Sequence, residues 1–118
     1  MERKDVETWI EGYVRAWTSN DPQDIGGLFT DGAAYYTAPF RDPWTGRDAI
    51  VQGWLGRKEE PDEWTFRSEV LAIAGDVGFV QGQTDYPKEE KGYSNLWVIR
   101  LAEDGRCSEF TEWWMEHT

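Results

Sequence analysis

The side chains that could do chemistry in this sequence are carboxylates and tyrosines rather than metal ligands. Cys107 is the only cysteine, and His117, next to the last residue, is the only histidine. This pair argues against a buried zinc or copper site, and one cysteine allows no intrachain disulfide. No glycine-rich phosphate loop indicates a nucleotide. We therefore expect no metal and no cofactor, and acid/base work by a group that titrates near the working pH.

Charge and composition limit the partners. The 118 residues include 23 acidic and 12 basic ones, for a net charge of −11. Such a chain repels phosphate backbones and anionic membrane surfaces, so we expect no nucleic acid and no membrane as partner. No apolar run approaches the roughly 20 residues of a spanning helix, and the N-terminus has no signal-peptide pattern. These features predict a cytoplasmic protein.

The spacing of apolar residues predicts the elements that must position any site. The length indicates a single domain, 1–118. Helical periodicity predicts a first helix over 6–17, a second from Pro22 that carries Ile25, Leu28 and Phe29, and a third over 47–57. Alternation predicts strands over 33–37, 64–74, 77–86, 93–101 and 106–116, with 38–46 as a loop. The fold class is therefore α+β, with helices on one face of a curved, mostly antiparallel sheet.

Several short motifs occur in this order of elements. They are Tyr13-Val14-Arg15-Ala16-Trp17, Leu28-Phe29-Thr30-Asp31, Gly46-Arg47-Asp48-Ala49-Ile50 and the last strand from Gly105 to Trp114. Together they make the chain resemble the nuclear transport factor 2-like superfamily, in particular its SnoaL-like branch, over essentially its whole length. The resemblance implies a cone: a curved sheet wrapped around three helices, with a pocket at the open end. Many members of the superfamily are homodimers.

The chain matches the catalytic positions of the ketosteroid isomerases of this superfamily only in part. Tyr13 falls on the position of their oxyanion-hole tyrosine. Thr37 or Ala38 stands where the general-base aspartate is expected, Trp97 where the second oxyanion donor is, and Trp54 where a supporting tyrosine is. Because the catalytic aspartates are absent, we do not expect ketosteroid isomerisation by that mechanism.

Within the implied cone, alternation along each strand separates a pocket face from an outer face. The expected ligand-binding residues combine a wall of rings with polar groups. They are Trp17, Tyr35, Thr37, Trp54, Gln81, Gln83, Tyr93, Asn95, Trp97, Phe110 and Trp114. A small hydrophobic molecule would suit such a pocket. The alternative is a mutually paired network that closes the cone, and a one-residue slip of register would exchange the two faces of any strand.

Asp85 and Glu112 are the only carboxylates that this alternation turns inward, so we predict them as the acid/base pair. Trp97 and Trp114 would surround them with apolar surface, which raises the pKa of a carboxyl group toward neutrality. Tyr13 would donate a hydrogen bond to a developing oxyanion. Alternatively, Asp85 is solvated at the rim, Glu112 forms a structural ion pair with an arginine, and Tyr13 is a core aromatic.

The sequence thus favours a cofactor-free isomerase, cyclase or lyase that acts on a hydrophobic, ring-containing substrate. A non-catalytic ligand-binding or dimerisation module of the same fold is the alternative. An epoxide hydrolase that uses Asp85 and Arg67 is a lesser one, because a third member of its catalytic set is not evident. The outer sheet face, centred on Leu96, Val98 and Trp113, is apolar enough to predict a homodimer packed sheet to sheet.

Overall fold

The computed structural model describes residues 1–117, which form three α-helices and a six-stranded sheet. The helices are α1 (Arg3–Ser19), α2 (Pro22–Gly26) and α3 (Arg47–Gly56). The strands are β1 (Phe29–Tyr36), β2 (Trp44–Thr45), β3 (Thr65–Ala74), β4 (Val77–Tyr86), β5 (Lys91–Leu101) and β6 (Cys107–Glu116), and two short 3₁₀ turns are η1 (Pro61–Glu63) and η2 (Pro87–Glu89).

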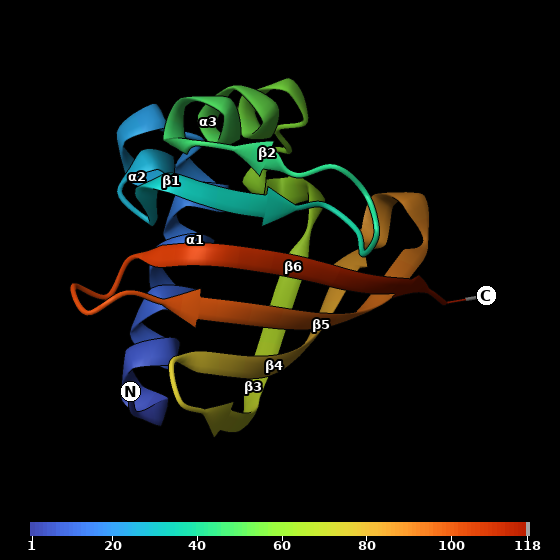
Figure 1. The fold of residues 1–118 in the computed structure, drawn as a ribbon. Coiled ribbons are helices and arrows are strands. Elements are labelled where there is room, and N and C mark those ends of the chain that lie inside the picture. Colours follow the sequence, from blue (N-terminus) through green and yellow to red (C-terminus); the bar gives the residue numbers. More distant parts are fainter. Residues whose placement is uncertain (118) are drawn as a thin grey trace.

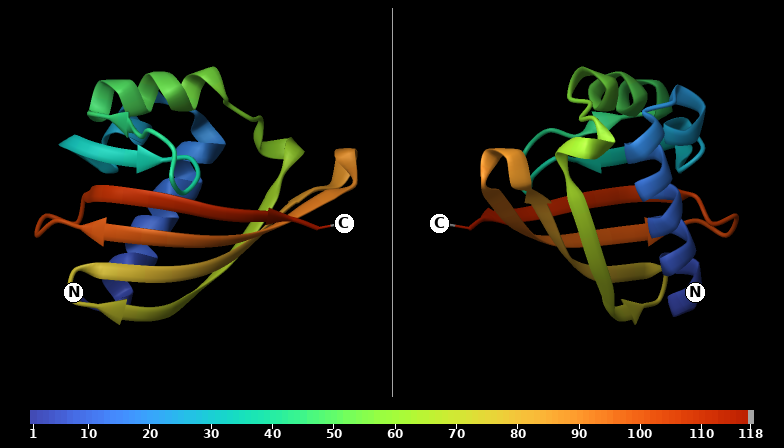
Figure 2. Two further views of the ribbon diagram at one scale, coloured as in Figure 1. Left: turned by 45° about the vertical axis from the view of Figure 1, so that its right-hand side comes forward. Right: turned by 180° about the vertical axis from the view of Figure 1, so that it is seen from behind.

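The strands lie in the order β2-β1-β6-β5-β4-β3. All neighbouring strands are antiparallel except β1 and β6, which are parallel. The sheet curves, and α1 runs across its concave face while α3 lies over β1 and β2 (Figures 1 and 2). This architecture confirms the predicted α+β class with a curved, mostly antiparallel sheet around three helices.

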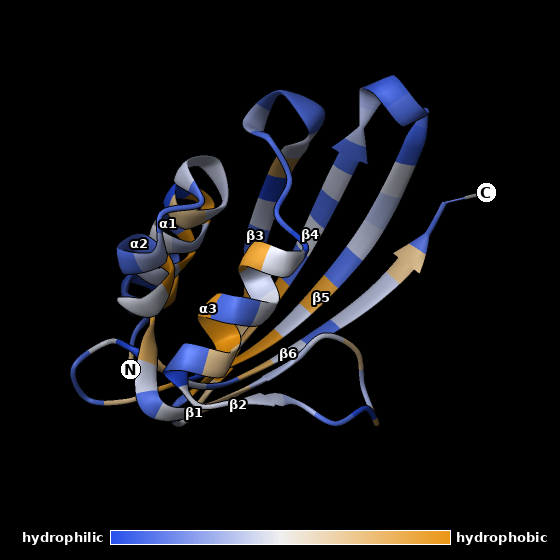
Figure 3. Ribbon diagram, turned by 90° about the horizontal axis from the view of Figure 1, so that it is seen from above, coloured by the Kyte–Doolittle hydropathy of each residue, from blue (hydrophilic) through white to orange (hydrophobic). Residues whose placement is uncertain are grey.

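The core lies between α1 and the centre of the sheet. One face of α1 is buried and consists of Val6, Trp9, Ile10, Tyr13 and Ala16. It packs with Trp97, Ile99 and Phe110, each at most 2% exposed, from β5 and β6. Each such side chain contributes roughly 1.5–3 kcal/mol by leaving water. Figure 3 shows apolar residues concentrated where the strands pass α1 and α3, and more hydrophilic strand ends on the side of the C-terminus.

The structure differs from the sequence prediction between α1 and α3. The second helix ends at Gly26 instead of reaching Phe29, because the Gly26–Gly27 pair ends the turn and β1 begins at Phe29. The expected loop 38–46 contains β2, whose Thr45 and Trp44 pair with Ala34 and Tyr35 of β1. A strand of two residues is too short for alternation to reveal.

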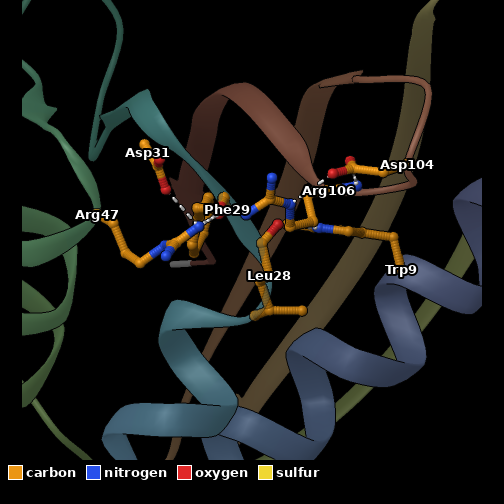
Figure 4. Close-up of polar contacts among 7 residues, drawn as sticks. All are labelled: Trp9, Leu28, Phe29, Asp31, Arg47, Asp104 and Arg106. Atoms are coloured by element: carbon orange, nitrogen blue, oxygen red, sulfur yellow. Dashed lines mark hydrogen bonds and ion pairs between the residues drawn. The ribbon is translucent and has the colours of Figure 1, made fainter.

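Side-chain hydrogen bonds fix the start of β1, together with Leu28 directly before it, to α1 and α3 (Figure 4). Trp9 Nε1 of α1 donates to the carbonyl of Leu28 at 2.9 Å. Arg47 of α3 donates from Nε and Nη2 to the carbonyl of Phe29 at 3.3 and 3.1 Å, and pairs with Asp31 at 2.7 Å. These contacts set the position of β1 relative to α1 and α3, which all contribute side chains to the same pocket.

Two glycines close the hairpins of the sheet. Gly75, between β3 and β4, and Gly105, between β5 and β6, have φ values of 62° and 86°. A residue with a Cβ is strained in this left-handed region, so glycine is the residue that these turns favour. Within residues 1–117, no helix combines the length and the apolar composition needed to cross a membrane.

Candidate functional site

A pocket of about 330 Å³ opens where β1, β4, β5 and β6 meet the ends of α1 and α3. The strand ends concerned lie together on the C-terminal side of the sheet (Figure 1). Nine of the lining residues are aromatic: Tyr13, Trp17, Tyr35, Trp44, Trp54, Tyr86, Tyr93, Trp97 and Trp114. The others are Thr37, Arg57, Lys58, Glu59, Thr84, Asn95 and Glu112. The volume is at the small end of the range for ligand pockets, and the lining has the usual mixture of rings and a few polar groups.

The structure brings together ten of the side chains selected from the sequence. These are Tyr13, Trp17, Tyr35, Thr37, Trp54, Tyr93, Asn95, Trp97, Glu112 and Trp114. Phe110 lies beneath them, fully buried, with its ring centroid 4.6 Å from that of Tyr35 and 5.6 Å from that of Tyr13. It supports the aromatic wall and does not line the pocket.

The inward orientation predicted for Gln81, Gln83 and Asp85 is wrong. In the β4–β5 ladder Thr84 lies opposite Tyr93. Even-numbered residues of β4 therefore share the pocket face with odd-numbered residues of β5. The three predicted side chains point to the outer face, where Gln83 Nε2 donates to both carboxylate oxygens of Asp85 at 3.2–3.3 Å.

Glycines on the inner face of β4 explain why alternation misled the prediction. Gly78 and Gly82 carry no side chain to mark the buried row. A Cβ on Gly78 would lie 2.8 Å from Val6 of α1, and one on Gly82 would lie 2.7 Å from Phe66 of β3. The inner face is thus filled by its neighbours, while the outer face carries the larger and more conspicuous side chains.

Six lining residues were not selected from the sequence: Trp44, Arg57, Lys58, Glu59, Thr84 and Tyr86. Thr84 and Tyr86 follow from the corrected face of β4. Trp44 belongs to the unpredicted β2, and the other three form the charged connector after α3. No residue pattern in that connector indicates that it borders a pocket.

Glu112 is the carboxylate at the centre of the site. It lies directly opposite Trp97 in the β5–β6 ladder. Its Oε2 accepts hydrogen bonds from Asn95 Nδ2 and Trp97 Nε1, both at 2.9 Å, and Oε1 has no hydrogen-bond donor among residues 1–117. Burial raises the pKa of this carboxyl group to about 7, and the two hydrogen bonds oppose that rise. Glu112 can therefore hold or release a proton near neutral pH.

Thr84 fixes the orientation of the amide that faces Glu112. Its Oγ1 donates to Asn95 Oδ1 at 2.8 Å, so the amide nitrogen of Asn95 points toward the carboxylate. Thr84 is 4% exposed, and it is the only buried residue among 1–117 with a polar side chain that is not aromatic. A chain of three polar side chains thus spans β4, β5 and β6 and sets the rotamer of Glu112.

Two tyrosines form a hydrogen-bonded pair next to this carboxylate. The hydroxyls of Tyr13 on α1 and Tyr35 on β1 are 2.7 Å apart, and both side chains are 7% exposed. Burial is the main reason that the pKa of each hydroxyl lies above its ordinary value, and the charge of Glu112 adds to the effect. Both hydroxyls stay protonated at neutral pH. One donates to the other, which leaves one proton of the pair for a ligand.

Glu59 supplies a second carboxylate to the same pocket. Its Oε1 accepts hydrogen bonds from Trp17 Nε1 at 3.2 Å and from Tyr86 Oη at 3.0 Å. Its backbone carbonyl accepts from Asn20 Nδ2 at 2.8 Å, and Asn20 Oδ1 in turn accepts from Trp54 Nε1 at 3.3 Å. These bonds tie the connector to α1, α3 and β4. The pocket does contain two carboxylates, but they are Glu112 and Glu59 rather than Glu112 and Asp85.

Two cations complete the charged groups of the pocket. Arg57 and Lys58 are exposed, and the guanidinium carbon of Arg57 lies 5.5 Å from the centroid of the Trp44 ring. Exposed charges at a rim are screened by solvent more strongly than the enclosed carboxylate. Within residues 1–117, no group of three or more His, Cys, Asp or Glu side chains is arranged to hold a metal ion.

Comparison with known proteins places the chain in a family. The family described as SnoaL-like domain matches residues 10–110. No curated protein sequence matches the chain at a significant level.

Solved structures with the same architecture are distant in sequence. A proposed ketosteroid isomerase from Kribbella flavida DSM 17836 has 15% identity and a TM-score of 0.72, over 98% of this chain and 81% of that one. An NTF2-like protein of unknown function from Mesorhizobium loti has 19% identity and a TM-score of 0.71, over 98% and 95%. Another, from Burkholderia xenovorans LB400, has 11% identity and a TM-score of 0.77, over 100% and 88%. At these identities the likeness shows the fold alone.

Proposed function

The chain belongs to the SnoaL-like domain family, and from that premise we propose that its pocket binds a small molecule on which Glu112 moves a proton. The reaction is cofactor-free acid/base catalysis of the kind that isomerases, cyclases and lyases perform. The substrate is small and contains a ring or another extended apolar part, because nine aromatic side chains line about 330 Å³.

The geometry of Glu112 carries this proposal. One carboxylate oxygen is held by Asn95 and Trp97, and the other has no donor among the described residues. A pKa of about 7 gives comparable populations of acid and base at neutral pH, which is what efficient proton transfer needs. A carboxylate kept in place only for packing would need no free oxygen toward a cavity.

The Tyr13–Tyr35 pair supplies the hydrogen-bond donor that stabilises the negative charge formed in the reaction. Removal of a proton next to a carbonyl places negative charge on the carbonyl oxygen, and a fixed hydroxyl donor stabilises that charge. The two hydroxyls, 2.7 Å apart, polarise one another. The hydroxyl that donates to the ligand is therefore a stronger donor than that of a lone tyrosine. In this scheme Tyr13 and Tyr35 bind the oxyanion and Glu112 is the base. Asp85 has no part, because its side chain lies on the other face of β4.

Exchange of carbon-bound hydrogen tests the proposal without a known substrate. The protein is incubated in D₂O with a panel of cyclic ketones, and deuterium uptake next to the carbonyl is followed by proton NMR. We expect catalysed exchange for at least one ketone and a loss of at least about a hundredfold in Glu112→Gln, the typical contribution of a general base. Glu109→Gln, on the exposed face of the same strand, is the control and should exchange like the parent protein.

The second candidate function is a non-catalytic module that binds a ligand or forms a dimer. The exposed apolar side chains on the outer face of β5 and β6 favour it: Leu96, Trp113 and Met115 are 36%, 43% and 69% exposed. Ligand binding that survives in Glu112→Gln, without exchange in either protein, would favour this module over the enzyme. A homodimer through the outer face is compatible with both functions, and we propose it as the assembly.

A further inference from the structure

We propose that the ligand of this pocket is an organic cation, an ammonium group with apolar substituents. The inference rests on the proposed function only in taking the pocket as a ligand site. It adds the charge of the ligand, and it is carried by two observations, the free carboxylate oxygens and the surrounding rings.

The first observation concerns the two carboxylates of the lining. Each has one oxygen held by an indole and a second donor: Trp97 and Asn95 bind Oε2 of Glu112, and Trp17 and Tyr86 bind Oε1 of Glu59. The other oxygen of each receives no hydrogen bond from residues 1–117. Both carboxylates are therefore fixed in orientation and incompletely paired, and a positive charge is the partner that satisfies them best.

The second observation concerns the rings. Tyr13, Trp54 and Trp97 largely cover one another, with the Trp54 and Trp97 centroids 4.8 and 4.6 Å from that of Tyr13, whereas Trp114 of the same lining is 51% exposed, with Tyr93 edge-on to it at 6.1 Å. Aromatic faces carry negative electrostatic potential, which attracts ammonium groups. One ring of the lining already holds a cation of the chain itself, because the guanidinium of Arg57 lies over Trp44 at 5.5 Å.

The charges of Arg57 and Lys58 do not cancel this preference in the interior. Both side chains are exposed, and Arg57 is engaged with Trp44. Glu112 is enclosed by Asn95, Trp97 and the aromatic wall, where solvent screens its charge less. The enclosed part of the pocket thus carries negative charge, while the exposed positive groups are screened by solvent.

A pair of probes with the same shape isolates the charge. Choline and its carbon isostere 3,3-dimethylbutan-1-ol differ only in the replacement of the quaternary nitrogen by carbon. Binding of each to the full chain is measured by isothermal titration calorimetry in about 0.15 M salt, which screens exposed charges. We expect choline to bind at least tenfold more tightly than the alcohol.

Variants locate the preference in the pocket. Glu112→Gln should reduce the preference for choline at least fivefold, and Glu59→Gln should also reduce it. Glu109→Gln removes one negative charge from the outer face and should leave the preference unchanged. Thermal unfolding by circular dichroism checks that each variant is folded. If one of the two pocket variants fails to fold, the other still tests the inference.

Equal or tighter binding of the neutral alcohol overturns the inference. An equal loss of the preference for choline in the pocket variants and in Glu109→Gln overturns it too, since that pattern reflects the net charge of −11. Absence of binding by both probes overturns it as well. None of these outcomes decides the proposed function, because hydrogen exchange of neutral ketones is measured separately. Conversely, choline binding with the expected preference would stand even if no ketone exchanged.

Discussion

Glu112 connects the chemistry of the pocket with the stability of the fold. Burial raises the pKa of its carboxyl group from 4.5 to about 7. Between these values the unfolded chain has lost the proton that the folded chain keeps, so the free energy of unfolding falls as the pH rises through this window. From this difference in pKa, the free energy of unfolding is lower above the window than below it by on the order of 3 kcal/mol.

Glu112→Gln should remove this part of the pH dependence. The amide cannot ionise, and its oxygen can accept the bonds from Asn95 and Trp97. We expect the variant to be more stable than the parent at about pH 8 and to lose that advantage at about pH 5, as measured by urea unfolding. An advantage of the same size at both pH values would contradict a raised pKa. In addition to burial, the charge of Glu112 raises the pKa of the Tyr13, Tyr35 and Tyr86 hydroxyls, but these groups are protonated at both pH values in both proteins.

Residue types alone predicted part of the site. Glu112 and Asn95 fall on strands whose inner rows carry large apolar residues, so alternation pointed them inward. Glu59 could not be found in this way, because its place depends on bonds to Trp17 and Tyr86 from distant elements. Tertiary contacts of this kind leave no local pattern.

At the scale of elements, α3 supports the aromatic wall through a close contact with β2. Gly53 of α3 faces the indole of Trp44, and a Cβ there would lie 2.3–2.7 Å from three ring carbons. This contact allows the helix to approach the strand and holds Trp44 at the edge of the pocket.

Gly53→Ala should therefore displace the Trp44 ring. Overpacking of this kind costs about 1–3 kcal/mol, which exceeds the gain of up to about 1 kcal/mol from better helix propensity. We expect a lower midpoint in urea unfolding and weaker binding of pocket ligands. Gly56→Ala, in the same helix with nothing within 4 Å of its Cβ, is the matched control and should be neutral or slightly stabilising. A neutral Gly53→Ala would mean that the helix and the strand are not in this contact.

The elements were predictable where one pattern dominated. The amphipathic row of α1 and the alternation in β5 and β6 contain enough large residues to define both type and face. β4 was predictable as a strand but not in its orientation, because Gly78 and Gly82 occupy its inner row. β2 was missed because pairing with β1, rather than its own composition, makes its two residues a strand.

At the scale of the whole molecule, family and fold limit the function without fixing it. A fold does not by itself determine chemistry, so the proposed acid/base catalysis depends on Glu112 and its neighbours. The outer face of the sheet carries exposed apolar side chains that the pocket does not explain. It carries Leu96, Trp113 and Met115, and the exposed ring of Phe40 lies edge-on to Trp113 at 6.1 Å.

Trp113→Asp should disrupt the proposed homodimer. Burial of a charge in an apolar interface is costly unless the charge is paired, and Trp113 lies near the centre of the patch with Leu96 directly opposite in the β5–β6 ladder. We expect the parent chain to have twice the protomer mass by light scattering at micromolar concentration and the variant to have the protomer mass of 13.7 kDa. Leu71→Asp, which changes a side chain 51% exposed on the edge strand β3, is the control and should leave the mass unchanged. A parent chain that is already monomeric, or a Trp113→Asp variant with the mass of the parent, would exclude an interface at this position. An equal loss of mass in Trp113→Asp and Leu71→Asp would indicate a general effect of added charge.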